Sequence, residues 1–483
     1  MTDAAATASP PEPDNPAADP RFYAQGGHIL LGGSDAGIEY IDLKLANRHG
    51  LVTGATGTGK TVTLQVMAEG FSAAGVPVFA ADIKGDLSGI GAIGEPKPHL
   101  LKRAEEIGLP GYANAAFPVA FWDIFGEQGH PIRTSAETMG PLLLSRLLEL
   151  SEPQEGVLNI AFRWAEDRRE RDPHMVIRKL RDLRAVIEEM GRRASELRPK
   201  YGNVAPQTVG VLQRRLLVLE EQGADKFFGE RSLDINDFLK CAPDGRGIIN
   251  ILAAEKLMNN PRLYATCLLW MLSELFEKLP EVGDLEKPKL VFLFDEAHLL
   301  FNDAPKAVLD QIERVTRLIR SKGVGVYYVT QSPGDVPDRI SAQLANRIQH
   351  ALRAFTPKEQ KAIKAAATTF VKNPEINAEQ AIQQLRVGEA LVSTLRGKGE
   401  PSMVQRTLIR PPMARVGPLN ASERAALIAK DTENSAKYGE EVITVGAYES
   451  VLKLNSISGS VSDKLGSAKD KVGGWFGIGR KDR

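Results

Sequence analysis

The chain has 483 residues, which is long for a single core, so we expect two or three folded units or one enlarged domain. Lys plus Arg and Asp plus Glu both number 61, so no overall charge draws the protein to nucleic acid. Hydrophobic residues make up 43%, which is typical of a soluble globular protein. The two cysteines, Cys241 and Cys267, stand in apolar surroundings and are expected to be buried thiols in a reducing compartment.

The two ends of the chain differ in composition from the middle. Residues 1–20 contain no Lys or Arg and no apolar run, which indicates a disordered leader and not a signal peptide. No run of about 18 apolar residues occurs anywhere, so we expect no transmembrane segment and, by default, a cytoplasmic protein. Residues 412–483 are expected to form an appendage with a flexible tail. The apolar stripe within 461–475 leaves open a docking helix for a partner or a membrane surface.

Residues 21–134 alternate between strand and helix patterns and are expected to form the N-terminal part of an α/β core. A hairpin is predicted over 28–43, where two alternating runs flank turn-forming residues. The elements that follow are a buried strand at 49–54, a helix at 61–74 and strands at 76–82 and 117–124.

Residues 135–240 have apolar residues spaced by three and four, which predicts an all-helical insertion of four or five helices. The alternation returns in 241–411, the expected C-terminal part of the core. Its predicted strands are 245–254, 289–298, 323–331, 347–355 and a closing hairpin of 389–395 with 402–410. Its predicted helices are 261–278, 304–320, a short one at 338–345 and one that begins at Pro357. Strands that alternate with helices favour a mostly parallel sheet with helices on both faces.

A glycine-rich stretch follows the buried strand at 49–54 and satisfies the pattern G-x-x-x-x-G-K-[ST]. Glycines allow backbone N–H groups to turn toward a phosphate, and the following helix adds the positive end of its dipole. Lys60 is expected to contact the β- and γ-phosphates, and the Thr61 hydroxyl to bind Mg²⁺. The expected nucleotide-binding residues are Gly54, Ala55, Thr56, Gly57, Thr58, Gly59, Lys60 and Thr61.

Two acids stand directly after a second buried strand, in the segment LVFLFDEAH. Carboxylates at the exit of a core strand are costly to place unless they meet a metal ion or a water molecule. We therefore expect Asp295 to hold Mg²⁺ and Glu296 to polarise the attacking water. The alternative is a pair of solvated acids at a strand end.

Three further polar residues are candidates for this site. Gln331 ends the strand VGVYYVTQ and can orient water beside the γ-phosphate, although a plain strand-end amide is the alternative. Asp82 ends the strand at 76–82 and either lies near the metal or caps a turn with Gly85. His298 is expected to contact the neighbouring strand and not to be catalytic.

Five motifs together resemble the HerA/FtsK class of ring-forming ATPases, and most closely its bacterial HerA-like (YjgR-like) group. They are LVTGATGTGKTVTLQ, FAADIKGDLSG, LVFLFDEAHLLF, IERVTRLIRSKGVGVYYVTQSPGDVP and LANRIQHAL, in the order of the family. The resemblance covers roughly residues 20–450. It implies a RecA-like P-loop core, ATP hydrolysis with Mg²⁺, a homo-hexamer with sites between subunits, and movement on double-stranded DNA.

The resemblance also implies an arginine that acts on the nucleotide of a neighbouring subunit. Its place in this sequence is Arg320, just before the strand that ends in Gln331, and Arg317 and Arg347 are the other candidates. The chain departs from HerA translocases at its start. Only residues 1–53 precede the loop, which leaves no room for their N-terminal β-barrel and weakens the expectation of a nuclease partner.

Two functions stay open on the sequence. The first is a DNA-dependent motor, for which local basic charge is weak, because residues 163–200 hold twelve Lys or Arg against eight Asp or Glu. The second is a nucleotide-gated ATPase that acts on a protein partner through the tail after residue 455. The DEAH tetrapeptide is also found in DEAH-box helicases, but the second RecA-like domain of those helicases is not recognisable after it in this sequence.

Overall fold

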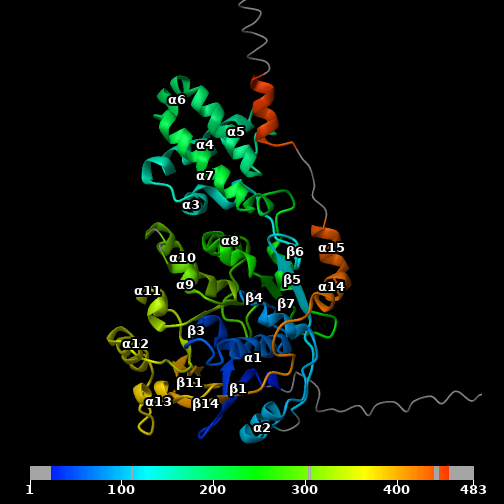
Figure 1. Ribbon diagram of the computed structural model, residues 1–483, viewed down its shortest axis with the longest axis vertical. Coiled ribbons are helices and arrows are strands. Elements are labelled where there is room, and N and C mark those ends of the chain that lie inside the picture. Colours follow the sequence, from blue (N-terminus) through cyan, green and yellow to red (C-terminus); the bar gives the residue numbers. More distant parts are fainter. Residues whose placement is uncertain are drawn as a thin grey trace, which may run out of the picture.

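The computed structural model describes residues 23–24, 26–109, 112–302, 304, 306–439 and 445–455. Within these residues the chain builds one 12-stranded sheet, whose central part is parallel (Figure 1). The strands, in their order across this sheet, are β2 (Gly37–Asp42), β1 (His28–Ser34), β14 (Gln405–Ile409), β11 (Glu389–Ser393), β10 (Asn346–Gln349), β3 (Gly50–Thr53), β9 (Val324–Thr330), β8 (Leu290–Phe294), β4 (Val78–Asp82), β7 (Ile249–Ala253), β5 (Val119–Asp123) and β6 (His130–Pro131).

Across the sheet, neighbouring strands from β10 to β6 pair parallel, and neighbouring strands from β2 to β10 pair antiparallel. The predicted α/β class with a mostly parallel sheet is therefore confirmed. A separate short ribbon is formed by β12 (Leu395–Arg396) and β13 (Glu400–Pro401). The sequence predicted neither this ribbon nor β6, since pairs of two residues carry no periodic signal.

Helices cover both faces of the sheet, and the strands are buried on both sides. In β4, Val78 and Ala80 enter one apolar core, whereas Phe79 and Ala81 enter the other. The first core is closed by α1 (Lys60–Ala73) and α2 (Pro98–Ile107), and the second by α8 (Pro261–Lys278) and the helices near it. The remaining helices of this part are α9 (His298–Phe301), α10 (Lys306–Leu318), α11 (Asp338–Ser341), α12 (Pro357–Thr368) and α13 (Ala378–Gln384).

Five helices between β6 and β7 stand together at one end of the molecule (Figure 1). They are α3 (Ala136–Leu147), α4 (Glu152–Arg169), α5 (Leu180–Arg192), α6 (Ala194–Tyr201) and α7 (Pro206–Glu221). Helix α5 buries Leu183, Val186, Ile187 and Met190, which is the three-and-four spacing of a helix with one apolar face. Its opposite face carries charged residues, so α5 packs against its neighbours with one face and meets solvent with the other.

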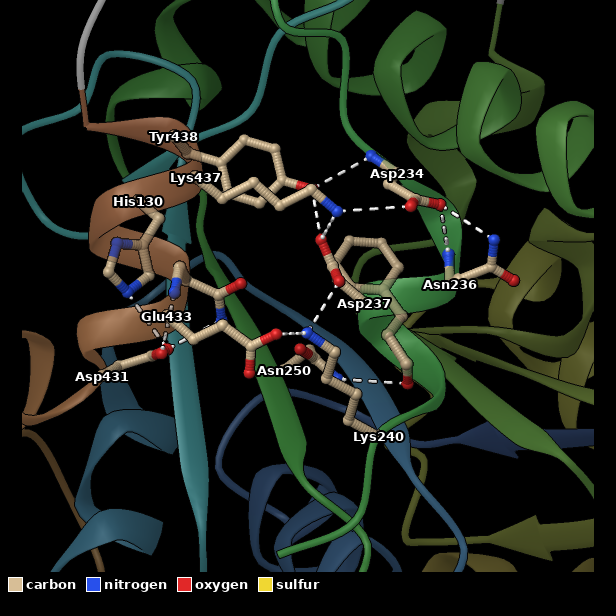
Figure 2. Close-up of polar contacts among 12 residues, drawn as sticks. His130, Asp234, Asn236, Asp237, Lys240, Asn250, Asp431, Glu433, Lys437 and Tyr438 are labelled. Atoms are coloured by element: carbon tan, nitrogen blue, oxygen red, sulfur yellow. Dashed lines mark hydrogen bonds and ion pairs between the residues drawn. The ribbon is translucent and has the colours of Figure 1, made fainter.

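The segment after β14 packs against the rest of the protein, unlike the appendage that composition suggests. Helices α14 (Ala421–Lys430) and α15 (Thr432–Tyr438) lie along β5 and β6, and residues 447–455 form a helix beside α5 (Figure 1). The side chain of Lys437 donates to the Asp237 carboxylate over 2.8 Å, and the Tyr438 hydroxyl donates to the same carboxylate (Figure 2). The expected leader and the apolar stripe at 461–475 lie outside the described residues.

Two smaller expectations need correction. Cys267 is buried in α8, but Cys241 is exposed in a loop that forms an isolated bridge with Gly247. The strand predicted at 347–355 ends at Gln349, and the backbone that follows bonds to Thr53 and Ala55 at the start of the glycine-rich loop. Among the described residues, no helix combines the length and the apolar character that a membrane span requires.

A buried ion pair fixes the end of the sheet to α1. Arg410 and Glu69 are 1% and 0% exposed, and their charged groups meet at 3.1 Å. Arg410 also donates to the carbonyls of Leu30 and Val66, each at 3.0 Å, and the Glu69 carboxylate accepts the N–H of Met413. The two charges thus have hydrogen-bond partners from three segments, which is the condition under which a buried pair is tolerated.

Removal of one partner should therefore destabilise the fold strongly. We expect Arg410→Met to lower the free energy of unfolding by about 3–5 kcal/mol, because it leaves the Glu69 carboxylate buried without its counter-charge. Urea denaturation followed by circular dichroism measures the change.

The matched control is Arg163→Met, because Arg163 pairs with Glu166 at 3.0 Å while both side chains are 65% exposed. Its effect should stay below about 1 kcal/mol. Equal effects of the two substitutions would contradict this assignment.

Candidate functional site

The candidate site lies where four neighbouring parallel strands end. The strands β3, β9, β8 and β4 lie side by side in this order, all in the same direction. Their carboxyl ends therefore meet at one edge of the sheet, which is where open α/β sheets bind ligands. The residues that follow these ends are the loop 54–59, Gln331, the pair Asp295 and Glu296, and Asp82.

The glycine-rich loop passes close to other backbone and therefore needs its glycines. A Cβ at Gly54 would lie 2.5 Å from the Cβ of His350. Gly59 has a φ of 113° as it leads into α1, and a Cβ there would lie 3.1 Å from the backbone N of Gly388. Side chains are excluded at both positions by contact, by conformation or by both. The loop thus turns its backbone into the N-terminus of a helix of 14 residues, which is an anion-binding arrangement.

Lys60 is the first residue of α1, and its side chain lies against this loop. Its Nζ donates to the carbonyl of Gly54 at 2.6 Å and to that of Ala55 at 3.2 Å. The residue is 8% exposed, and burial lowers the pKa of its ammonium group. Thr61 follows it and is half-buried at the same helix end. The lysine and the threonine hydroxyl that the sequence singles out are therefore both at the loop.

His350 supports the loop from beneath, a role that the sequence analysis missed. Its backbone N donates to the carbonyl of Thr53 at 2.7 Å, and its Nδ1 lies 2.9 Å from the carbonyl of Glu389. Because a carbonyl only accepts, Nδ1 carries the proton, and Nε2 accepts from the Thr63 hydroxyl at 2.8 Å. Burial lowers the pKa of the ring to about 4, so the imidazole is neutral. It ties the loop to β10 and β11.

The two acids that follow β8 are in different surroundings. Asp295 has its pKa raised to about 6, because burial and the neighbouring Glu296 charge both disfavour its ionised form. Its Oδ1 accepts the N–H of Glu296 at 2.9 Å, and its carbonyl accepts the Tyr264 hydroxyl at 2.9 Å. Glu296 has a φ of 45°, a left-handed conformation that a non-glycine residue adopts at a cost. These contacts hold that conformation and direct the Glu296 side chain.

Three side chains surround the Glu296 carboxylate. His298 Nδ1 and Gln331 Nε2 each lie 3.3 Å from Oε2, and Lys84 Nζ lies 3.9 Å from Oε1. The His298 contact is the main cause that holds the pKa of Glu296 below its ordinary value, and the same contact raises the pKa of His298. Glu296 is thus an ionised carboxylate in a nearly buried position. The contacts of His298 and Lys84 with Glu296 were not predicted from the sequence.

Asp82 caps the turn that follows β4 and lies beside the acids that follow β8. Its Oδ2 accepts the N–H of Leu87 at 3.0 Å, so it caps the turn that follows β4. Its strand also pairs with β8, where Ala81 lies opposite Phe294, so Asp82 is close to Asp295. Burial is the main cause that raises the pKa of Asp82 to about 7, and the Asp295 charge adds to it.

The structure does not bring Arg320 to this edge. Arg320 precedes β9 and therefore lies at the amino end of the strand, opposite the end that carries Gln331. Its guanidinium is partly exposed and lies 3.7 Å from the Asp284 carboxylate. Of the other candidates, Arg317 is exposed on α10, and Arg347 donates to the carbonyl of Ser341 at 2.9 Å.

The residues at the edge fit a magnesium ion that is held together with a nucleotide. The described residues contain no cluster of three His, Cys, Asp or Glu side chains that could hold a metal by themselves. Mg²⁺ usually takes one or two carboxylates, and the substrate phosphates and water complete its shell. Two adjacent acids, of which Asp295 has a raised pKa, form the kind of donor set that a divalent cation would stabilise.

Comparisons with known proteins agree with this geometry. Residues 30–475 match the family described as Helicase HerA-like C-terminal. No curated protein sequence matches the chain. Among solved structures, the bacterial conjugative coupling protein TrwBdeltaN70 is similar at 15% identity and a TM-score of 0.51, over 84% of this chain and 93% of that one.

Two other solved structures are similar over comparable lengths. TrwB in complex with the non-hydrolysable ATP analogue ADPNP has 15% identity and a TM-score of 0.51, over 84% of this chain and 94% of that one. VirB4 of Thermoanaerobacter pseudethanolicus has 15% identity and a TM-score of 0.49, over 80% and 97%. At such identities the likeness to TrwB shows the fold alone. The family match spans most of the chain, and we conclude that the protein belongs to the HerA-like helicase C-terminal family, as a P-loop ATPase of the HerA/FtsK class.

Proposed function

We propose that the protein is a Mg²⁺-dependent ATP hydrolase that assembles into a hexameric ring and uses hydrolysis to move along double-stranded DNA. The observation that carries this proposal is the arrangement around Glu296. An ionised carboxylate in a left-handed backbone conformation lies among Lys84, His298 and Gln331 at the edge that also carries the glycine-rich loop. Such strain, held in place by its neighbours, is typical of a catalytic position.

Each residue at the edge has a role that follows from its chemistry. The N–H groups of residues 54–59 would surround the β-phosphate, and the Lys60 ammonium would contact the β- and γ-phosphates. The Thr61 hydroxyl and the Asp295 carboxylate would hold Mg²⁺, which supplies positive charge to the phosphate oxygens. Glu296 would accept a proton from the attacking water, and the Gln331 amide would orient that water.

Lys84 is an additional positive group at this site. Its ammonium lies 3.9 Å from Glu296 and favours the ionised form of both Asp295 and Glu296. We assign to it the role of keeping Glu296 ionised and of placing positive charge near the γ-phosphate. Electrostatic stabilisation of this kind is usually the largest part of catalysis of phosphoryl transfer.

We also assign to Arg320 the role of acting on the nucleotide of a neighbouring subunit. It lies at the edge of the sheet opposite the glycine-rich loop of its own chain and is 40% exposed, so a second subunit can reach it. An arginine that acts in this way contributes about 10³–10⁵ in rate. This role depends on ring assembly and is part of the same proposal.

DNA as the substrate is supported by the family, whose description names a helicase. One observation favours the second candidate, an ATPase that acts on a protein partner without nucleic acid. The basic residues in 163–200 are largely neutralised, since Arg163, Arg192 and Lys200 each pair with an acid. This surface therefore offers little free positive charge for phosphates.

The role of Glu296 can be tested with one isosteric change. We expect Glu296→Gln to lower kcat of ATP hydrolysis by about 10²-fold or more, because the amide cannot accept the proton of the attacking water. ATP affinity should stay within about three-fold of the parent value, since binding relies on the loop and Lys60. Steady-state phosphate release and binding of a fluorescent ATP analogue measure the two quantities.

The matched control is Glu281→Gln, an exposed residue that precedes the amino end of β8. Its rate should equal that of the parent protein. A Glu296→Gln protein with normal turnover would remove Glu296 from the mechanism.

The DNA-dependent motor makes a separate prediction. ATP hydrolysis should rise several-fold on addition of linear double-stranded DNA at about 50 mM salt and respond much less at about 200 mM, because contacts to phosphates release counterions. The control is an acidic polypeptide added at the same total negative charge as the DNA. A rate that ignores DNA at both salt concentrations would favour the protein-partner alternative.

A further inference from the structure

A polar cavity lies at the junction between the helices α3–α7 and the ATPase core. Its volume is about 740 Å³, which is in the range of small-molecule sites. Residues from α3, α4, the start of α8, α9 and α10 line it, and none of them belongs to the candidate ATP site. Four of the lining side chains are amides, namely Gln222, Asn259, Asn260 and Asn302.

Arg146 is a cation in the wall of this cavity, and no ion pair of its guanidinium is found among the described residues. The residue is 7% exposed, and its Nη2 donates to the carbonyl of Leu300 at 3.0 Å. Its Nη1 is buried and has no hydrogen-bond partner among the described residues. Burial, together with repulsion by Arg262, lowers the pKa of the guanidinium to about 10. An unpaired buried charge of this kind is costly, and an anion in the cavity would offset the cost.

The acidic side chains in the cavity wall do not supply the counter-charge for Arg146. Glu149 is bonded to Arg262, and its Oε2 also accepts from Arg215 at 2.6 Å. Glu155 lines the cavity from the first turn of α4, and no ion pair between it and Arg146 is found among the described residues. Neither of these two acids therefore forms an ion pair with Arg146 among the described residues.

The N-terminal end of helix α8 also faces this cavity, and its Arg262 is paired there with Glu149. Helix α8 has 18 residues and begins at Pro261, and its N-terminal residues 260–262 line the cavity. Arg262 lies in its first turn, where the helix dipole and the side chain have the same sign. Arginines with planar donor groups are the residues that bind phosphate in a bidentate way. The donors thus come from two separate segments, α3 and α8.

We propose that this cavity is a second anion site, which binds a phosphate group through Arg146 and Arg262. The site is distinct from the ATP site, and the proposal does not depend on movement along DNA. The Leu300 carbonyl that Arg146 contacts belongs to α9, which begins two residues after Glu296. An anion bound in the cavity would therefore lie next to α9, the helix that directly follows the segment with Glu296.

The test uses the full chain with its ATP site filled. The Glu296→Gln protein, saturated with ATP and Mg²⁺, is titrated in one arm with inorganic phosphate and in another with AMP, by isothermal calorimetry in low-salt chloride buffer. We expect one further molecule to bind per chain, with a Kd below about 10 mM. Tighter binding of AMP would identify a nucleotide, and equal binding would identify the phosphate group alone; either result supports an anion site.

Two substitutions locate the binding. Arg146→Gln should abolish it, and Arg262→Gln should weaken it about ten-fold or more, because each removes a charged donor. Arg262 is 56% exposed, so its replacement keeps the test valid if Arg146→Gln fails to fold. Arg163→Gln, an exposed arginine on α4, is the matched control and should bind as the parent does. Absence of binding up to about 10 mM, or equal affinity in the Arg262 and Arg163 variants, would overturn the proposal.

Discussion

The parallel pairing of β3, β9 and β8 is the constraint on which the rest of the site depends. Thr53 lies opposite Thr330, and Phe294 lies opposite Tyr328, so the three strands end almost level. The glycine-rich loop, Gln331 and the two acids then leave the sheet at one edge, although they are far apart in the sequence. Because both faces of these strands are buried, a shift of register by one residue would disturb two apolar cores at once. The packing that stabilises the fold also positions the chemistry.

The charged side chains of the candidate site are poorly solvated, and their charges depend on one another. Lys60 and Asp295 each have a pKa displaced toward the neutral form by burial, while Glu296 is kept ionised by His298, Gln331 and Lys84. The site is thus poised for a polyanion and a divalent cation, whose charges would compensate those of the side chains. Away from the site, the Glu69 and Arg410 pair shows the same principle in a structural setting, where all charges are already matched. Arg146 has no such match among the described side chains, and an anion in its cavity would compensate the charge.

Much of the core could be predicted from the sequence. Continuous apolar runs mark β8 and β9, and the glycine pattern marks the turn into α1, so the loop residues and the acids were found by local signals alone. The contacts of His350 and Lys84 could not be found in this way, because they arise from pairing of β10 with β3 and of β4 with β8. The segment after β14 was also misjudged. Its anchors are backbone N–H groups of Met413 and Ala414 on Glu69, which leave no pattern in composition.

The central claim is that one edge of the sheet assembles a single site for ATP and Mg²⁺. It is tested most directly by a crystal structure of the protein with a non-hydrolysable ATP analogue and Mg²⁺. The account predicts the β-phosphate within the loop 54–59, Lys60 at the γ-phosphate, the metal ion beside Thr61 and Asp295, and a water molecule between Glu296 and the γ-phosphate. A nucleotide bound elsewhere, or a Glu296 carboxylate directed away from the γ-phosphate, would contradict it.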